Sequence, residues 1–257
     1  MGRIKLGISL KSLGQPFRRS LPAAQALGVA GIELEALGEL APTNLTATGR
    51  REITHLLRSH DLAISAINCP LRRGIDVAVD LEPRLDYIRD AMTLAFDLGP
   101  RLIIIPIGKI AEKEDSPERN MLKEALLNLG KFGDRTGVIV ALDLGGDDPA
   151  IAVDLLAKLD TGSLAVIYNP ASLAVAGRNP HDALRALHRR VAMVHAQDAR
   201  RISPNRMGAV PLGHGDIDWL QLAADFTEID YRGWWTILAD DRAEDKASVA
   251  FLQRVMP

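Results

Sequence analysis

Short apolar runs alternate with longer amphipathic segments from one end of the chain to the other. The short runs predict strands, and the segments between them carry apolar residues at helical spacing, which predicts helices. The predicted strands cover residues 4–10, 31–36, 62–67, 102–107, 138–143, 164–169, 191–195 and 233–238. The predicted helices cover residues 20–27, 48–60, 82–98, 116–135, 150–158, 180–189, 219–228 and 245–255.

This strict alternation of strand and helix indicates a parallel sheet with right-handed crossovers. Eight such units in 257 residues fit a closed barrel better than an open sheet. The predicted fold class is therefore α/β, with one (β/α)8 TIM barrel domain over residues 1–257. The chain has neither a strand–GxGxxG–helix segment nor a phosphate-binding GxxxxGK loop, so we expect no nucleotide cofactor.

Three neighbouring predicted strands end on a polar residue, namely Asp143, Asn169 and His195. Side chains alternate along a strand, so these residues share their faces with apolar pairs: Ile139 and Ala141, Ala165 and Ile167, and Val191 and Met193. A polar group is costly deep in a barrel core, but at the carboxyl ends of the strands it meets water, metal or substrate. We therefore predict the functional site at this end of the barrel. The eighth strand departs from the pattern, because its corresponding face ends on Leu238.

The stretch 191–219 adds further candidates after the seventh strand. Asp198 and Arg201 follow His195 at once, and a long loop then leads to His214 between two glycines. Each of these has an alternative: Asp198 as a brace for the loop, Arg201 as part of a solvated basic loop, and the glycines of Gly-His-Gly as a simple turn.

Two earlier strands bring polar residues to the same end. Glu33 and Glu35 share a face of the second strand, and Asn68 follows the third. One interpretation places a carboxylate of this pair inside the upper barrel as a substrate contact. The other places both in water at a frayed strand end.

Six segments give the chain a resemblance to the xylose-isomerase-like superfamily of barrels: GIELEA, VALDLGGDDP, YNPASL, VHAQDARR, PLGHGDIDW and YRGWWTIL. That family includes sugar and sugar-phosphate isomerases and epimerases. The resemblance implies a divalent metal, Mn²⁺, Mg²⁺ or Zn²⁺, held by Glu, Asp, His and Glu from strands five to eight. At the matching positions this chain has Asp143, Asn169, His195 and Leu238, and Asp240 lies two residues beyond Leu238.

Three hypotheses follow from this resemblance and its departures. The first is a sugar or sugar-phosphate isomerase or epimerase with a degenerate metal site made of Asp143, Asn169, His195 and Asp240. Asp143, His195 and Asp198 would then be catalytic, and the substrate contacts would be Glu33, Asn68, Arg201 and His214. The second is a non-catalytic barrel that binds a sugar-like or acidic small molecule without metal. The third is metal-free acid–base chemistry by His195, Asp198 and His214.

Composition excludes several other classes of function. With 31 Lys and Arg against 33 Asp and Glu, the net charge of −2 gives no electrostatic case for nucleic acid or an anionic membrane. His55, His60, His181 and His188 fall on predicted helices or just beyond them and are expected at the surface.

The single cysteine, Cys69, excludes an intramolecular disulfide and suits a reducing compartment. No signal peptide or membrane-spanning run is evident, so the sequence predicts a cytoplasmic protein with a small-molecule partner. The resemblance adds the expectation of a homo-oligomer.

Overall fold

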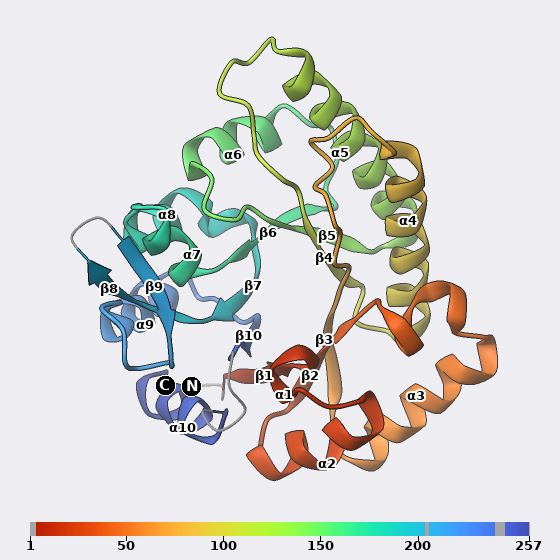
Figure 1. Cartoon of the computed structure of the whole chain (residues 1–257), viewed down its shortest axis with the longest axis vertical. Helices are drawn as coiled ribbons and strands as arrows, with labels where there is room; N and C mark the ends of the chain where they lie inside the picture. The colour runs from red at the N-terminus through yellow and green to blue at the C-terminus, as the bar shows by residue number, and fades with distance from the viewer. Residues whose placement is uncertain (1–3, 204–205, 240–244, 257) are drawn as a thin grey trace.

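A computed structural model describes residues 4–203, 206–239 and 245–256 of the chain. Eight parallel strands close into a barrel in the order β1-β10-β7-β6-β5-β4-β3-β2 (Figure 1). The strands are β1 (Lys5–Ser9), β2 (Gly31–Glu35), β3 (Ala63–Asn68), β4 (Leu102–Pro106), β5 (Ile139–Asp143), β6 (Leu164–Tyr168), β7 (Val191–Ala196) and β10 (Trp234–Ile237). The predicted (β/α)8 barrel is confirmed, and each predicted strand matches one barrel strand.

An outer layer of helices covers the barrel wall (Figure 1). Its main members are α2 (Phe17–Leu27), α3 (Ala47–Ser59), α4 (Leu81–Leu98), α5 (Pro117–Thr136), α6 (Pro149–Ala157), α8 (Pro180–Leu187), α9 (Trp219–Glu228) and α10 (Asp245–Val255). Several begin at a side-chain cap: the Ser116 hydroxyl accepts from Arg119 N, and the Asp218 carboxylate accepts from Gln221 N. The helices bury their apolar faces against outward-facing strand residues such as Ile32 and Ile103.

The barrel interior is a second, smaller apolar cluster. It is formed by Ala66, Leu102, Ile104, Ala141, Ile167 and Met193, with Trp234 packed against it. This cluster confirms the inward face predicted for the fifth, sixth and seventh strands. The Trp234 ring lies against Gly31, where a Cβ atom would come within 2.7 Å of two ring atoms. A glycine is therefore required on β2 for the indole to fit at this level of the barrel.

The connection after β7 differs most from the sequence prediction. Where a long loop was expected, the chain forms an antiparallel hairpin of β8 (Asp198–Ser203) and β9 (Arg206–Val210). Short helical segments also form outside the predicted helices: α1 (Leu10–Leu13), η1 (Gly38–Leu40), η2 (Pro42–Asn44) and α7 (Pro170–Val175). The end of the helix predicted over residues 180–189 is a separate 3-10 turn, η3 (His188–Arg190). The hairpin packs on α7, which supports a ribbon that two strands alone would not stabilise.

The first long helix, α2, begins earlier than predicted. It starts at Phe17, and the expected cap residue Ser20 lies inside it, donating its hydroxyl to the carbonyl oxygens of Gln15 and Pro16. The cap contact comes instead from Glu39, whose carboxylate accepts from Phe17 N at 3.3 Å. This contact spans 22 residues and could not be read from local sequence.

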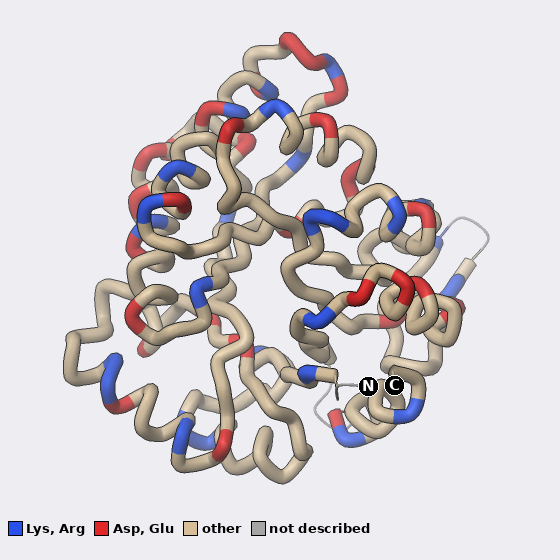
Figure 2. The backbone as a smooth tube through the Cα atoms, turned by 180° about the vertical axis from the view of Figure 1, so that it is seen from behind, with Lys and Arg blue, Asp and Glu red and all other residues tan. Residues whose placement is uncertain are grey.

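The outer surface mixes both signs of charge. Figure 2 shows acidic and basic residues interspersed around the helical layer, in keeping with the near balance of charge in the sequence. Among the described residues, no helix is long and apolar enough to cross a bilayer.

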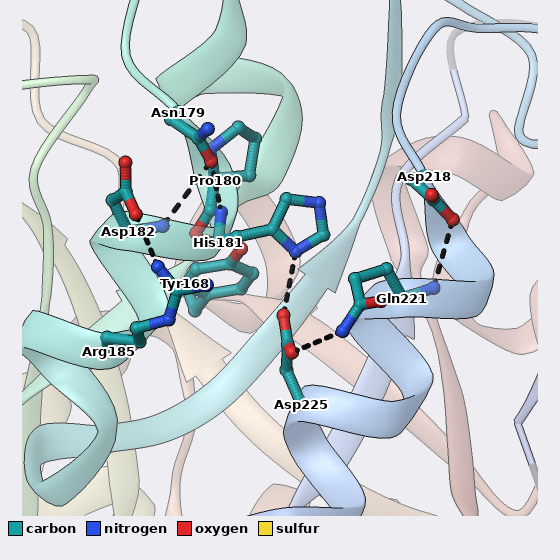
Figure 3. Close-up of polar contacts among 9 residues, drawn as sticks. All are labelled: Tyr168, Asn179, Pro180, His181, Asp182, Arg185, Asp218, Gln221 and Asp225. Carbon is teal, nitrogen blue, oxygen red and sulfur yellow. Dashed lines mark hydrogen bonds and ion pairs between the residues drawn. The ribbon is translucent and has the colours of Figure 1, made fainter.

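A polar clasp joins α8 to α9 (Figure 3). His181 Nδ1 lies 2.7 Å from Asp225 Oδ2, and Gln221 Nε2 donates to Asp225 Oδ1 at 2.9 Å. Burial alone would raise the pKa of Asp225, but the hydrogen bonds from His181 and Gln221 outweigh it and hold this pKa below its ordinary value. The His181 side chain is 19% exposed, so this histidine of the helical layer is half-buried by its contact with α9.

We predict that Asp225→Asn lowers the free energy of unfolding near neutral pH by about 1 kcal/mol. Because the folded pKa of Asp225 is lowered, its contribution is present above the ordinary carboxyl pKa and is lost as the pH falls through the lowered value. Urea titrations of wild type and variant should therefore converge in acid. Asp182→Asn is the matched control, since its exposed pair with Arg185 contributes little. Equal losses in the two variants would contradict the clasp.

Candidate functional site

The carboxyl-end mouth of the barrel holds a buried ion pair. Glu33 Oε2 on β2 lies 2.7 Å from His195 Nε2 on β7, and their side chains are 0% and 5% exposed. Two strands, β1 and β10, separate β2 from β7 in the barrel wall, so the pair spans the interior of the mouth. Glu33 therefore points into the upper barrel, which favours the first of its two sequence interpretations.

The surroundings of His195 stabilise its charged form. Burial alone would lower the pKa of His195, but the Glu33 carboxylate outweighs burial, with a smaller contribution from Asp143, and the pKa is raised above its ordinary value. Asn68 Nδ2 donates to the other Glu33 oxygen at 3.4 Å. Both carboxylate oxygens of Glu33 thus have partners, as a buried charge requires.

Glu35 lies on the same face of β2, closer to the strand end, and is half-buried. Burial raises the pKa of the Glu35 carboxyl; Glu33 adds to this shift and Lys11 opposes it. Near neutral pH, a carboxylate with a raised pKa is better matched to proton transfer than an ordinary one.

Two other rim residues already have partners within the protein. Gly145 N donates to Asp143 Oδ1 at 3.0 Å. Asn169 caps α7, because its Oδ1 accepts from Ser172 N at 3.1 Å, while its Nδ2 donates to Gln197 Oε1 at 3.3 Å. Gln197 is a rim contact that the sequence did not predict, since only the barrel register brings it beside Asn169.

Histidine, cysteine and carboxylate side chains do not gather into a set of three able to hold a metal ion anywhere in the described part of the chain. Asp240, the fourth predicted metal-binding residue, lies outside the described residues.

Asp198 is buried at the start of the hairpin and binds backbone. Its Oδ1 accepts from Ala199 N, and its Oδ2 accepts from Gly213 N and Gly215 N at 2.9 and 3.0 Å. A Cβ atom at position 215 would come within 1.9 Å of Asp198 Oδ1, so the glycine is needed for this approach. These contacts match the alternative role of Asp198, in which it braces the loop and takes no part in catalysis.

Arg201 and His214, the remaining candidates, are exposed. Arg201 lies on β8, where its backbone N–H donates to Asp216 Oδ2 at 2.7 Å. His214 lies in the turn after β9, and its backbone N–H donates to Pro211 O. The structure therefore brings together Glu33, Asn68 and His195, with Asp143 close enough to influence the pKa of His195. Arg201 and His214 lie at the surface, on the hairpin and in the turn that follows it.

Comparison with known proteins identifies the family context of this site. A family model described as xylose isomerase-like TIM barrel matches residues 21–255. No curated protein sequence matches the chain.

Solved structures of similar fold cover almost the whole chain. A xylose isomerase domain protein from Planctomyces limnophilus has a TM-score of 0.86 at 21% identity, covering 98% of this chain and 96% of its own. A D-tagatose 3-epimerase-like protein has a TM-score of 0.82 at 17% identity, with coverages of 98% and 97%. A xylose isomerase-like TIM barrel protein from Mycobacterium smegmatis, in complex with magnesium, has a TM-score of 0.76 at 16% identity, with coverages of 98% and 96%. At these identities the likeness shows the fold alone.

We predict that Glu33→Ala destabilises the protein by about 3–5 kcal/mol, because it leaves His195 buried without its partner. Glu35→Ala is the matched control on the same strand face, with an expected loss below about 1 kcal/mol. Denaturant unfolding of both variants measures these losses.

The double variant Glu33→Ala/His195→Ala tests the coupling directly. Its loss should be smaller than the sum of the two single losses, because it removes both members of the pair at once. Additive losses would contradict a direct interaction between these side chains.

Proposed function

The chain belongs to the xylose isomerase-like TIM barrel family, and from that premise we propose that its mouth binds a small sugar-like molecule at a site of the isomerase and epimerase type whose divalent-metal site is degenerate. The observation that carries the proposal is the buried contact between Glu33 and His195. This contact engages Nε2 of His195, which is the one residue that matches the metal-binding pattern of the family.

The chemical character of the mouth supports a polyhydroxylated ligand. Carboxylates and amides line the rim, at Glu35, Asn68, Asp143 and Gln197, above an apolar barrel interior. Such groups donate to and accept from hydroxyl and carbonyl oxygens, and a few placed polar groups over apolar walls are typical of small-molecule sites. The names of two structural neighbours, a xylose isomerase domain protein and a D-tagatose 3-epimerase-like protein, point to the same ligand class.

The residues present fit a divalent metal poorly. His195 Nε2 contacts Glu33, Asn169 Oδ1 accepts from the backbone of α7, and Asp143 Oδ1 accepts from Gly145 N. While His195 Nε2 is hydrogen-bonded to the Glu33 carboxylate, it has no lone pair available for a metal. An amide oxygen brings no charge to a site where Mg²⁺ or Mn²⁺ favours carboxylates. We therefore assign no step of the chemistry to a metal.

In the catalytic form of this proposal, protein groups move the proton. Glu35 and Asp143 are half-buried carboxylates near the pair, and Glu35 has the raised pKa that suits a general base. The protonated His195 contributes positive charge that stabilises an oxyanion forming at the mouth. Asp198 serves this site by holding the turn at Gly213 and Gly215 in place.

A non-catalytic ligand-binding barrel is the second candidate. It is favoured by the same set of contacts, because Glu33, Asn169 and His195 are each engaged by protein partners. The two candidates share the ligand and the site and differ only in whether a C–H bond of the ligand is broken.

One set of measurements separates these outcomes. Purified protein is titrated with Mn²⁺ by calorimetry, and D-tagatose and D-fructose are incubated with it in D₂O with chelator present. We predict that Mn²⁺ does not bind in a stoichiometric ratio. We also predict that sugar raises the melting temperature of the protein, and that this rise persists when the chelator is present. Deuterium in the recovered sugar identifies the enzyme, whereas binding without exchange identifies the ligand-binding barrel.

Asp143→Asn should weaken sugar binding by about tenfold, as expected when a charged hydrogen-bond acceptor is lost. Asp160→Asn, an exposed change in the loop after α6, is the matched control and should leave binding unchanged. Stoichiometric Mn²⁺ that disappears in His195→Ala would contradict the degenerate metal site. Failure of every sugar to bind would contradict the assignment of ligand class.

A further inference from the structure

We propose that the outer face of α3 carries a second binding site, independent of the mouth, for a small molecule bearing phosphate. Its position is a cavity of about 600 Å³ where α3 meets the end of α4. It is lined by Arg50, Arg51, Thr54, His55, Arg58 and Asp97. None of these residues belongs to the mouth, so this site is tested independently of the proposed function.

The charge of the cavity identifies the ligand as an anion. Three guanidinium groups and one carboxylate line it, in a chain whose net charge is −2. The one acidic residue within this stretch of α3, Glu52, points elsewhere, to Arg18 at 2.6 Å. Among the described ion pairs, Arg50 is bound to Asp97, whereas Arg51 and Arg58 have no carboxylate partner. Arg51 Nη2 donates to the Thr48 hydroxyl at 3.4 Å, so both guanidinium groups keep most of their donors for a ligand.

Helical spacing places these groups around one cavity. Arg51 and His55 are four residues apart, as are Arg50 and Thr54, and Arg58 follows His55 by three. Residues at these spacings are neighbours on a helix surface, so Arg51, His55 and Arg58 lie along one face of α3. An oxyanion at this position would meet the positive charge of Arg51 and Arg58.

Arg50 forms a fixed wall of the cavity. Its Nε donates to Leu45 O at 3.2 Å, its Nη1 binds Asp97, and its side chain is only 23% exposed. Thr54 is held as well, because its hydroxyl donates to Arg50 O at 3.0 Å. The wall is thus formed before a ligand arrives, which lowers the entropic cost of binding.

The size of the cavity and the type of donor narrow the range of possible ligands further. A volume of about 600 Å³ lies within the range of small-molecule sites and exceeds the space that one inorganic anion fills. Arginine forks bind phosphate oxygens in pairs with defined geometry, which lysine does not. We infer a ligand with one or two phosphate groups attached to a small organic body.

The test uses inorganic pyrophosphate as the probe, titrated into the full chain by calorimetry at low salt. The double variant Arg51→Ala/Arg58→Ala should weaken binding by about tenfold or more. The matched control, Arg189→Ala/Arg190→Ala, removes the same charge from η3 and should stay within about twofold of wild type. A third variant, Arg51→Lys/Arg58→Lys, should give intermediate affinity, since it keeps the charge and loses the paired geometry.

Backbone NMR shifts on adding pyrophosphate should be confined to α3 and the end of α4, and melting curves confirm that each variant is folded. Equal affinity in wild type and the Arg51→Ala/Arg58→Ala variant would overturn the site. Equal loss in the η3 control would also overturn it, because binding would then depend on net charge alone. Binding of D-tagatose at the mouth is unaffected by these changes in either case, which keeps this result separate from the test of the proposed function.

Discussion

Burial of the Glu33–His195 ion pair is the constraint on which the mouth of this barrel depends. Taking a carboxylate and an imidazolium out of water costs several kcal/mol for each ion, and only a close contact with further hydrogen bonds offsets that cost. Here the contact is 2.7 Å, Asn68 donates to the second Glu33 oxygen, and Asp143 adds negative charge nearby. Removing His195 would leave the Glu33 carboxylate buried without its partner, and removing Glu33 would leave a buried ring nitrogen of His195 unpaired.

The rest of the barrel positions this pair. Below the mouth the interior is apolar, and the indole of Trp234 lies against Gly31 at the lower level of β2. This packing fixes the position of β2 relative to β10 along the barrel axis. The pairing of Thr236 with His195 then fixes the position of β7 relative to β10. Two carboxyl-end residues from non-adjacent strands therefore meet because the core beneath them is rigid and fully packed.

The same pair is the basis of our proposal that the metal site is degenerate in this chain. His195 matches the family pattern, but its Nε2 faces Glu33. Asn169 supplies an amide that caps α7, and the eighth strand supplies Leu238. In the described residues, the polar contact across the mouth is the one between Glu33 on β2 and His195 on β7.

The sequence predicted the barrel well because strand and helix periodicities are local signals. The inward faces of β5, β6 and β7 followed from alternation alone, and they placed Asp143, Asn169 and His195 at the rim. The hairpin of β8 and β9 was missed, since its polar strands resemble a solvated loop and gain their support from α7. Asp198 was ambiguous for a similar reason, because two of its three backbone partners, Gly213 and Gly215, lie beyond the far end of that hairpin.

Pairing of Glu33 with His195 could not be derived from sequence. The two residues are 162 positions apart, and only closure of the barrel through β1 and β10 brings them together. Alternation along β2 left Glu33 equally suited to the interior and to water. Long-range contacts of this kind depend on strand order, which composition and spacing do not encode.

The protonation state of His195 is the most direct test of the ion pair with Glu33. NMR of ¹⁵N-labelled imidazole, assigned with His195→Gln, reports both ring nitrogens as a function of pH. We expect an imidazolium that persists above the ordinary histidine pKa, because the Glu33 carboxylate holds the proton on Nε2. We expect the Glu33→Gln variant to lose this behaviour. A neutral ring with an unprotonated Nε2 at neutral pH would contradict the ion pair, since that nitrogen would then be free to bind a metal.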